Sequence, residues 1–337
     1  MTTIKEIADL AGVSRGTVDR VLNNRGSVNP KTAEKIMGIV RAMDYRPNRA
    51  GITLAAQKKK YKIGVILFSE NNPFFDEVME GVRIKSSELQ DYGVATLTRR
   101  VEFDVDAQLT AIDELLAEGI HGLMLAPYNH IRIQEKIDEL VALQIPVVTV
   151  NTDIGGSRRL AYVGSDYFRG GCTAAGLFAL MTEGPVELGV ITGSSNVLCH
   201  TERIRGLRHI LDESYPRIRI ADILENHDDE FESYALTKRL LEENPGLDAV
   251  FFAAAGVYGG CRAIRESGRR LKVITFDDVP TTLEMLKDGV ISATISQQPI
   301  RQGSRSLDIL FEYLTSGILP EQDQNFVEHS IKIRENI

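Results

Sequence analysis

From Tyr61 onward, the sequence alternates short apolar runs rich in β-branched residues with longer stretches whose apolar residues recur at helical spacing. Repeated strand and helix units predict parallel sheets with helices on both faces, and this number of strands predicts two α/β lobes. The predicted strands are residues 62–68, 94–98, 122–125, 147–150, 160–163, 186–191, 249–252, 272–276 and 292–295. Amphipathic stretches between them include residues 74–89, 107–116, 168–181, 236–241 and 302–314.

The N-terminal segment has a different pattern, which predicts three short helices. Thr3 and Glu6 have the spacing of a capping box before a first helix. Ser14 can cap a second helix, and the Asn29-Pro30 pair is typical of the start of a third. Two helices joined by a tight turn and supported by a third form the helix-turn-helix plan, whose second helix lies in the DNA major groove.

The charge is divided unevenly along the chain. Residues 1–60 hold six lysines and six arginines against five acidic residues, a net charge of +7, whereas the whole chain has a net charge of −8. The rest of the chain therefore carries −15. A basic head on an acidic body is the electrostatic pattern of a protein that binds the DNA backbone, and a solvated basic surface is the alternative.

The residues of this head carry a family resemblance. IKEIADLAGVSRGTVDRVLNNRGSVNPKTAEKI, followed by MDYRPNRAGITLA, closely resembles the DNA-binding head and hinge of the lactose-repressor (LacI/GalR) family of bacterial transcription regulators. The resemblance implies a multidomain fold, with an all-α helix-turn-helix head at residues 1–46 and a hinge helix and linker at 47–60. Residues 61–337 would form a two-lobed α/β domain that binds an effector and dimerises.

The resemblance also implies which head residues touch DNA. Bases would be read from Arg15, Gly16 and Arg20, and each arginine can donate two hydrogen bonds to guanine. Gly16 has no side chain to read with, so we expect it to permit a close approach to DNA. Asp19 stands where the family usually has serine, and we expect a structural or neutral role for it. Phosphate contacts are expected from Thr17, Asn23, Ser27 and Lys31.

Residues 48–55 resemble the hinge helix of the family. Leu54 would insert into the minor groove at the centre of the operator, and Asn48 would contact DNA at the start of the hinge. An isolated helix of this length is unstable in water, since nucleation is unfavourable below about 12–15 residues. We therefore expect the hinge to fold only on DNA, beside a second copy of itself.

The body resembles, more weakly, the effector domain that this family shares with periplasmic sugar-binding proteins of the ribose-binding type. The implied N-lobe spans about 61–165 and 298–326, and the implied C-lobe about 166–297 and 327–337. The usual Asn-Asp pair at one strand end is replaced by Ala254-Ala255, so a standard pentose would leave hydroxyls unpaired. The effector residues expected from the resemblance and from compensation for such losses are Asn72, Phe74, Phe75, Asn151, Arg203, Asp228, Asp277 and Gln297.

Signals of catalysis or of a cofactor are missing from the sequence. The motifs GxxxxGK[ST], GxSxG and HExxH do not occur, and the six histidines lack metal-ligand spacing. Cys199 and His200 are neighbours on one predicted helix, where adjacent side chains are not expected to face each other. We therefore expect no enzymatic activity, no cofactor and no metal ion.

The cysteines and the apolar runs bear on where the protein works. Three scattered cysteines without a CxxC pair favour a reducing compartment. The N-terminus has no secretory signal pattern, and no uncharged apolar run is long enough to span a membrane. These features predict a cytoplasmic protein.

Together these features predict a ligand-responsive transcription regulator. We expect a repressor that binds a palindromic operator as a homodimer and responds to a monosaccharide, a polyol or a derivative. Induction and co-repression both remain open. The alternative class is a cytoplasmic sugar-binding or sugar-metabolising α/β protein whose basic head has another role.

Overall fold

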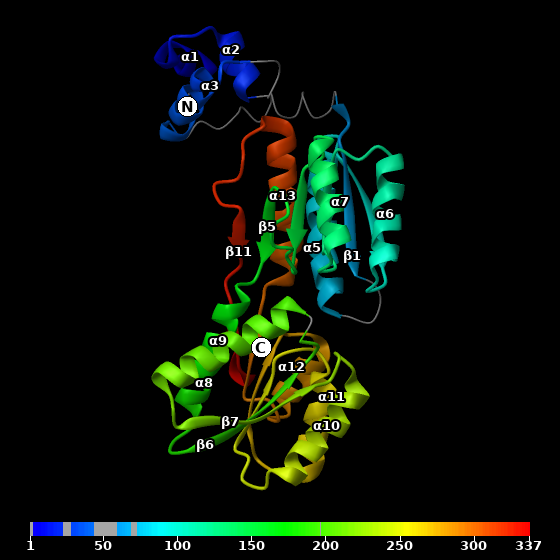
Figure 1. Ribbon diagram of the computed structural model, residues 1–337, viewed down its shortest axis with the longest axis vertical. Helices are drawn as coiled ribbons and strands as arrows, with labels where there is room; N and C mark the ends of the chain where they lie inside the picture. Colours follow the sequence, from blue (N-terminus) through cyan, green and yellow to red (C-terminus); the bar gives the residue numbers. More distant parts are fainter. Residues whose placement is uncertain (1–2, 23–27, 44–58, 69–72, 196) are drawn as a thin grey trace. The chain divides into compact units, whose positions relative to one another are not determined.

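The computed structural model describes residues 3–22, 28–43, 59–68, 73–195 and 197–337. Within these ranges the predicted two-part architecture is confirmed: a helical head is followed by two parallel-rich α/β sheets (Figure 1). No helix of the described ranges is both long enough and apolar enough to cross a membrane.

Three helices form the head: α1 (Ile4–Ala11), α2 (Arg15–Leu22) and α3 (Pro30–Ala42). The capping box is present, because Thr3 Oγ1 accepts from the Glu6 N–H at 3.3 Å and Glu6 Oε2 accepts from the Thr3 N–H at 2.7 Å. Ser14 Oγ accepts from the Thr17 N–H at 3.1 Å and so caps α2. The apolar faces of the three helices enclose a small core formed by Ile7, Ala8, Ala11, Val18, Leu22, Ile36 and Val40.

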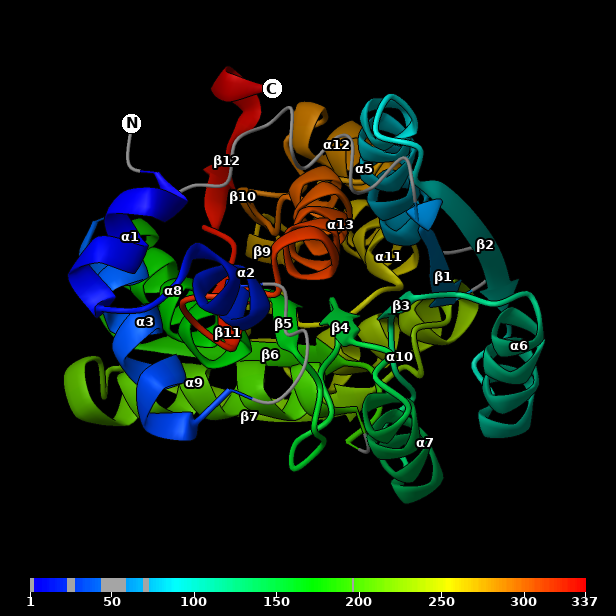
Figure 2. The same cartoon turned by 90° about the horizontal axis from the view of Figure 1, so that it is seen from above.

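The first sheet has the strand order β11-β5-β4-β3-β1-β2 (Figure 2). Its central strands are parallel and fully buried, as expected for a sheet with helices on both faces. Its strands are β1 (Lys62–Phe68), β2 (Ala95–Val101), β3 (Gly122–Leu125), β4 (Val147–Val150), β5 (Ala161–Gly164) and β11 (Gln324–Phe326). The helices around it are α5 (Pro73–Gln90), α6 (Val105–Ala117), α7 (Ile131–Ala142) and α13 (Pro299–Ser316).

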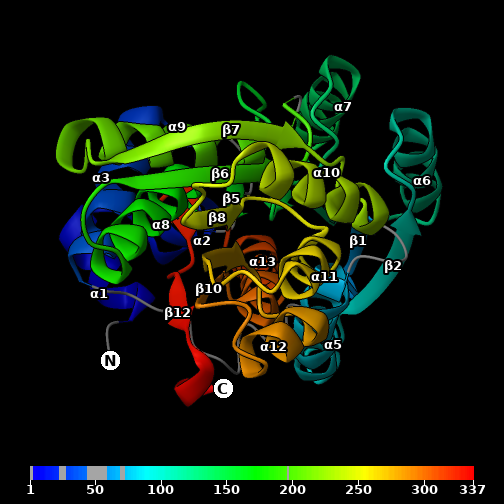
Figure 3. The same ribbon diagram turned by 90° about the horizontal axis from the view of Figure 1, so that it is seen from below.

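The second sheet has the order β12-β10-β9-β8-β6-β7, and β12 alone pairs antiparallel among the described strand pairs (Figure 3). Its strands are β6 (Val186–Thr192), β7 (Ile218–Glu225), β8 (Ala249–Phe252), β9 (Lys272–Phe276), β10 (Ala293–Ser296) and β12 (Ser330–Lys332). Its helices are α8 (Tyr167–Met181), α9 (Leu198–Ser214), α10 (Glu230–Glu243), α11 (Val257–Ser267) and α12 (Pro280–Lys287), and a short 3-10 turn, Arg334–Asn336, ends the chain.

Alternate residues of β8 show how the second sheet is covered. Phe251 packs into one apolar cluster with residues of α8 and α9. Val250 and Phe252 pack into the other cluster with residues of α10, α11 and α12. The sheet is therefore buried on both faces. In such a fold, ligands bind at the ends of the strands.

The chain divides into two compact units. The first unit comprises Met1–Glu70, Met79–Tyr162 and Gly303–Asn325, and the second comprises Asn71–Val78, Val163–Gln302 and Phe326–Ile337. This division differs from the expected lobes mainly at residues 71–78, which belong to the expected N-lobe but to the second unit of the structure. The described part of this segment begins α5, and its Glu77 lies within electrostatic range of Asp277 and Asp278 of the second unit.

Strand β7 is an element that the sequence pattern did not predict. It lies at the edge of the second sheet and pairs with β6 through a register shift between Leu188 and Gly189. Only Ile218 of β7 is fully buried, so the strand lacks the apolar run of its neighbours. Charged residues interrupt the apolar residues of β7, which a strand at the edge of a sheet tolerates.

Candidate functional site

Helix α2 carries the residues predicted to read bases on its exposed surface. Arg15, Gly16 and Arg20 are exposed, whereas Val18 on the same helix is fully buried in the head core. A Cβ atom on Gly16 would meet only Ser14 Oγ, at 3.7 Å. Packing within the head therefore does not require a glycine at position 16, and its role as a close-approach residue stays a prediction.

The predicted phosphate contacts are only partly within the described residues. Thr17 is half-buried and its hydroxyl lies 2.9 Å from Ser14 Oγ, while Lys31 is exposed in the first turn of α3. The Lys31 N–H donates to Asn29 Oδ1 at 3.0 Å, which confirms the predicted cap of α3. The remaining predicted DNA contacts, Asn23, Ser27, Asn48 and Leu54, lie outside the described residues, as does most of the hinge at 47–60.

In the second unit, the carboxyl ends of the strands gather the predicted effector residues. Asp277 directly follows β9 and Gln297 directly follows β10, its neighbour in the sheet. Gln297 Nε2 donates to Asp277 Oδ1 at 2.6 Å, and Gln297 Oε1 is buried without a hydrogen-bond partner. Asp277 has a φ of +66°, a left-handed conformation that aspartate tolerates better than most residues. Burial raises the pKa of Asp277, and the charge of Arg203 and the bond from Gln297 oppose this rise.

Arg203 is held by an aromatic ring and a backbone carbonyl. It is only 4% exposed, its guanidinium carbon lies 3.9 Å from the ring centroid of Phe276, and Nη1 donates to the Ala253 carbonyl at 2.8 Å. Its Nε has no hydrogen-bond partner. A buried donor without a partner is costly, so this atom is suited to a polar ligand.

Asp228 lies after β7 and holds a neighbouring strand end. Its Oδ1 accepts from the Ala255 N–H at 2.9 Å, and the Asn226 side chain donates to the Ala255 carbonyl at 2.8 Å. A Cβ atom on Gly256 would approach Asn226 Nδ2 to 2.4 Å, which explains why glycine follows Ala255. Two side chains from the loop after β7 thus form hydrogen bonds with the backbone at the position of the missing Asn-Asp pair.

The aromatic residues predicted from the resemblance start α5. Phe74 and Phe75 are 5% and 6% exposed, and their ring centroids lie 5.6 Å apart in an edge-to-face arrangement. Asn72 lies outside the described residues. Glu77, one turn further on, has a pKa raised to about 7 by burial and then by the charges of Asp278 and Asp277.

In the first unit, Asn151 directly follows β4 and has a φ of +61°. Its carbonyl accepts from the Tyr162 hydroxyl at 2.9 Å. Asp153, two residues further on, receives two 2.6 Å hydrogen bonds from Arg159. Asp153 is therefore committed to an internal ion pair.

Sequence reasoning missed an aromatic cluster at the carboxyl ends of the first sheet. Phe68 ends β1, and its ring centroid lies 4.6 Å from that of Phe103, which in turn lies 4.5 Å from that of Tyr128. Phe103 is 58% exposed. Gln108 fixes the loop after β3 by donating to the Ala126 carbonyl and accepting from the Tyr128 N–H, both at 2.9 Å. Their position just after strand ends is the signal that could have identified these residues.

Cys199 and His200 lie in the first turn of α9. His200 is 5% exposed, its Nδ1 lies 3.3 Å from the Ser194 carbonyl oxygen, and its Nε2 lies 3.7 Å from Asp228 Oδ1. Both nitrogens of the His200 ring are therefore directed at residues other than Cys199.

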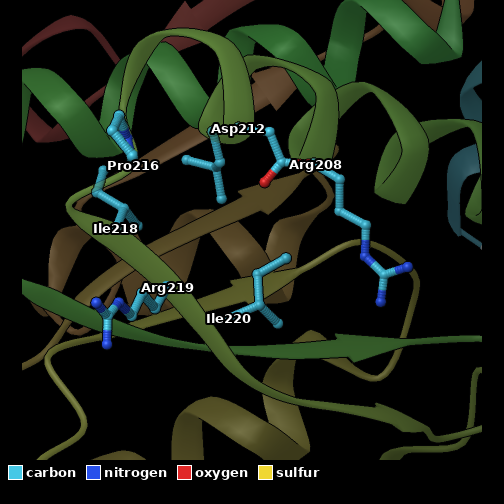
Figure 4. Close-up of a pocket in the computed structure, with 7 residues that line it drawn as sticks. Arg208, Asp212, Pro216, Ile218, Arg219 and Ile220 are labelled. Carbon is cyan, nitrogen blue, oxygen red and sulfur yellow. The ribbon is translucent and has the colours of Figure 1, made fainter.

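A separate hollow lies between α9 and the start of β7 (Figure 4). It is lined by Arg208, Leu211, Asp212, Pro216, Ile218, Arg219 and Ile220. It lies at the amino end of β7 and contains none of the predicted effector residues. Within the described ranges, no group of three or more His, Cys, Asp or Glu side chains could hold a metal ion.

Two family models match the chain. Residues 3–48 match bacterial regulatory proteins of the lacI family, and residues 63–317, more than half of the chain, match a periplasmic binding protein domain. The lacI match covers the head and enters the hinge, and the second match covers most of both sheets.

Among curated proteins, the chain is similar to the ribose operon repressor of Haemophilus influenzae, with 29% identity over 288 residues that cover 83% of this chain and 82% of the relative. It is 26% identical to the ribose import binding protein RbsB of Bacillus subtilis over 254 residues, covering 75% of this chain and 81% of that protein. A solved solute-binding protein from Burkholderia graminis in complex with D-arabinose shares the fold, with a TM-score of 0.76, 24% identity and coverage of 82% and 96%.

Proposed function

We propose a function from the premise that this chain belongs to the lacI family of bacterial regulatory proteins and carries a periplasmic binding protein domain after its head. Its relatives include repressors, which supports a DNA-binding transcription regulator that responds to a ligand. We propose further that it is a repressor acting as a homodimer on a palindromic operator, without enzymatic activity, in the compartment that holds the DNA.

The observation that carries the proposal is a polar cluster in the same chain as a helix-turn-helix head. Asp277 and Gln297 lie at the carboxyl ends of β9 and β10 and are joined by a hydrogen bond. Arg203, on α9, lies within electrostatic range of Asp277. Gln297 Oε1 and Arg203 Nε are buried without protein partners. A ligand with hydroxyl groups can both donate to the former and accept from the latter.

A carbohydrate-like effector suits this chemistry. A carboxylate beside an amide can accept from adjacent hydroxyl groups, and the Phe74 and Phe75 rings at the start of α5 offer apolar surface to sugar C–H groups. Two relatives are named for ribose, which supports the same class. We therefore propose a monosaccharide, a polyol or a derivative as the effector.

DNA binding is tested with the full-length protein and the DNA upstream of its own gene. Fluorescence anisotropy at two salt concentrations should show a complex that is selective against scrambled DNA and weakens as salt rises, because phosphate contacts release counterions. Equal affinity for both DNAs would reject the regulator and favour a sugar-binding protein whose basic head has another role. Sedimentation of the complex should give two chains on each operator.

The effector class is tested by thermal shift with D-ribose, D-arabinose, D-allose, ribitol and adenine. A ligand at about 100 times its Kd stabilises the folded state by about 2.7 kcal/mol. The proposal expects stabilisation by a sugar or polyol, together with a change in DNA affinity. Stabilisation by adenine alone would overturn the carbohydrate assignment.

A further inference from the structure

The carboxyl end of β8 carries methyl side chains in the middle of the second sheet. Strand β8 lies between β9 and β6, and Ala253, Ala254 and Ala255 follow it directly. Ala254 is 6% exposed and Ala255 is exposed, and we call these two residues the methyl surface. A ligand bound at the carboxyl ends of these strands therefore meets methyl groups at the strand between the two polar flanks.

The main chain around the methyl surface is already bonded to the protein. The Ala253 carbonyl accepts from Arg203 Nη1 at 2.8 Å. The Ala255 N–H donates to Asp228 Oδ1 at 2.9 Å, and the Ala255 carbonyl accepts from Asn226 Nδ2 at 2.8 Å. The Ala255 N–H is thus used before a ligand arrives, and each of the two carbonyls already accepts a hydrogen bond.

Asp228 supports the β8 end from the loop after β7. Besides its bond to Ala255, its Oδ1 lies 3.7 Å from Nε2 of His200, which is 5% exposed. A Cβ atom on Gly193 would lie 2.2 Å from His200 Cε1 and 3.0 Å from Asp228 Oδ2, so glycine leaves the room that this pair occupies. Oδ1 of Asp228 is therefore engaged by protein groups that hold the β8 end in place.

Polar atoms without partners lie on both flanks of the methyl surface. On the β9 and β10 side are Gln297 Oε1 and Nε of Arg203, whose guanidinium carbon lies 3.9 Å from the Phe276 ring centroid at the end of β9. On the β6 side is Oγ1 of Thr192, which is 2% exposed. Because a buried polar group without a partner is costly, a ligand gains hydrogen bonds at the two flanks.

The charges around these atoms favour a neutral ligand. Asp277 lies within electrostatic range of both Arg203 and Asp228. A sugar acid would place its carboxylate near two acidic residues, and a cationic ligand would face the guanidinium. Hydroxyl groups can donate to Gln297 Oε1 and accept from Arg203 Nε without either conflict.

We propose that the effector is a deoxysugar whose carbon without a hydroxyl group lies against Ala254 and Ala255. This inference rests on the proposed function, since it takes the effector to be carbohydrate-like. The hydroxyl groups of the sugar bind Gln297 and Arg203 on one flank and Thr192 on the other. A hydroxyl group placed against the methyl surface loses its water without gaining a protein partner, which lowers the affinity about ten- to hundredfold.

The primary test is thermal shift of the full-length wild-type protein with matched pairs of sugars that differ at one carbon. The pairs are L-fucose and L-galactose, L-rhamnose and L-mannose, 2-deoxy-D-ribose and D-ribose, and 2-deoxy-D-glucose and D-glucose. In the pair that gives the largest shift, the deoxysugar should act at a concentration at least about tenfold below that of its parent.

Two results would overturn the deoxysugar. A parent sugar that acts at the same or a lower concentration would do so and would leave the carbohydrate class in place. Absence of a shift with all eight sugars would do so as well, and the carbohydrate class would fall with it only if D-arabinose, D-allose and ribitol also failed to stabilise the protein.

A second test changes the methyl surface itself. Ala255→Asn places an amide at an exposed position, where the fold should tolerate it, and should shift the ratio of the two dissociation constants about tenfold towards the parent sugar. Ala221→Asn, at an exposed alanine within β7, is the matched control and should keep the wild-type ratio. An unchanged ratio in Ala255→Asn, or an equal change in both variants, would contradict the placement of the sugar.

Both measurements use the protein without DNA, so the two proposals can fail separately. Failure of the protein to bind its upstream DNA would reject the regulator assignment, and the preference between paired sugars would still be measured. A preference for the parent sugars in a protein that binds this DNA would reject the deoxysugar alone.

Discussion

Arg20 and Lys31 are both exposed cations of the head, but they should contribute differently to DNA recognition. Arg20 lies on α2, the helix predicted to enter the major groove, whereas Lys31 begins the supporting helix α3. An arginine can read guanine through two hydrogen bonds, whereas a lysine near the backbone acts through its charge.

Arg20→Ala should therefore weaken binding to the upstream DNA by about 1–3 kcal/mol and relax the base preference at one symmetric pair of positions. Lys31→Ala should weaken binding to all sequences alike and reduce the salt dependence. Competition with a library of DNA sequences at fixed salt measures both effects. A uniform loss in both variants would contradict direct readout by Arg20.

Glu77 should make the stability of the protein depend on pH near neutrality. Its pKa is raised from the ordinary value of 4.5 to about 7, first by burial and then by the charges of Asp278 and Asp277, whereas Lys332 opposes the rise. The folded state thus binds the proton more tightly than the unfolded state does. Stability should fall as the pH rises from about 4.5 through about 7.

Glu77→Gln should remove this dependence, so that the variant melts at a higher temperature than the wild type at pH 8 but not at pH 5. Thermal melts at half-unit pH intervals measure the effect. Glu284→Gln, which changes an exposed carboxylate on α12, serves as the control. If Glu77→Gln and the control had the same pH profile, the carboxylate cluster would not govern this window.

At the scale of elements, the head helices α2 and α3 each contain one glycine. Gly16 and Gly38 both lie in helices of the head, and neither has a neighbour that an added methyl group would strike. Alanine favours a helix over glycine by up to about 1 kcal/mol. Both substitutions should therefore stabilise the head.

Their effects on DNA binding should differ. Gly16→Ala should weaken binding to the upstream DNA, because we expect the helix backbone to approach the DNA at this position, whereas Gly38→Ala should leave it unchanged. Hydrogen exchange of the head amides and DNA affinity are the two measurements. Equal DNA affinities of the two variants would show that the approach at Gly16 leaves room for a methyl group.

The pairing of α8 with α9 depends on a close backbone contact. A Cβ atom on Gly171 of α8 would lie 1.9 Å from the Arg203 carbonyl oxygen on α9. One on Gly206 of α9 would lie equally close, 1.9 Å, to the Phe168 carbonyl oxygen. This contact places the helix that carries both Arg203 and Cys199.

Gly171→Ala should therefore destabilise the protein by about 3 kcal/mol or more, the upper range for overpacking, since the clash is with backbone. Gly176→Ala is the matched control, because it lies on the same helix with nothing within 4 Å of the added carbon. Thermal unfolding should show a large loss for the first and none for the second. Similar melting temperatures would mean that the two helices move apart at little cost.

At the scale of the whole molecule, the proposed function requires the second unit to control the head. Asp277→Asn keeps the shape and the left-handed backbone preference of the residue but removes its charge. The ligand found by thermal shift should then lose its effect on DNA affinity, while the affinity of the ligand-free protein stays within about tenfold.

Asp212→Asn is the matched control, because it changes an exposed carboxylate in the hollow of Figure 4, which contains none of the predicted effector residues. Titration of upstream DNA with and without ligand measures both variants. A normal ligand response in Asp277→Asn, or its loss in Asp212→Asn, would place the effector elsewhere.

The sequence by itself determined the elements whose signals are local. Thr3, Ser14 and Asn29 cap the head helices through bonds to residues two or three positions away, so their spacing was sufficient. The buried central strands were predicted from continuous apolar runs, and the order of strands and helices predicted parallel sheets. The family resemblance identified the strand-end position of Asp277.

Tertiary structure decided which residues distant in sequence come into contact. β7 has charged residues between its apolar ones and lies at a sheet edge, and only the folded sheet shows it as a strand. Arg203 stacks on Phe276, and His200 meets Asp228, across separations that no local pattern encodes. Local signals act through bonds within one turn, whereas a site built at strand ends exists only after the sheet has set which ends are neighbours.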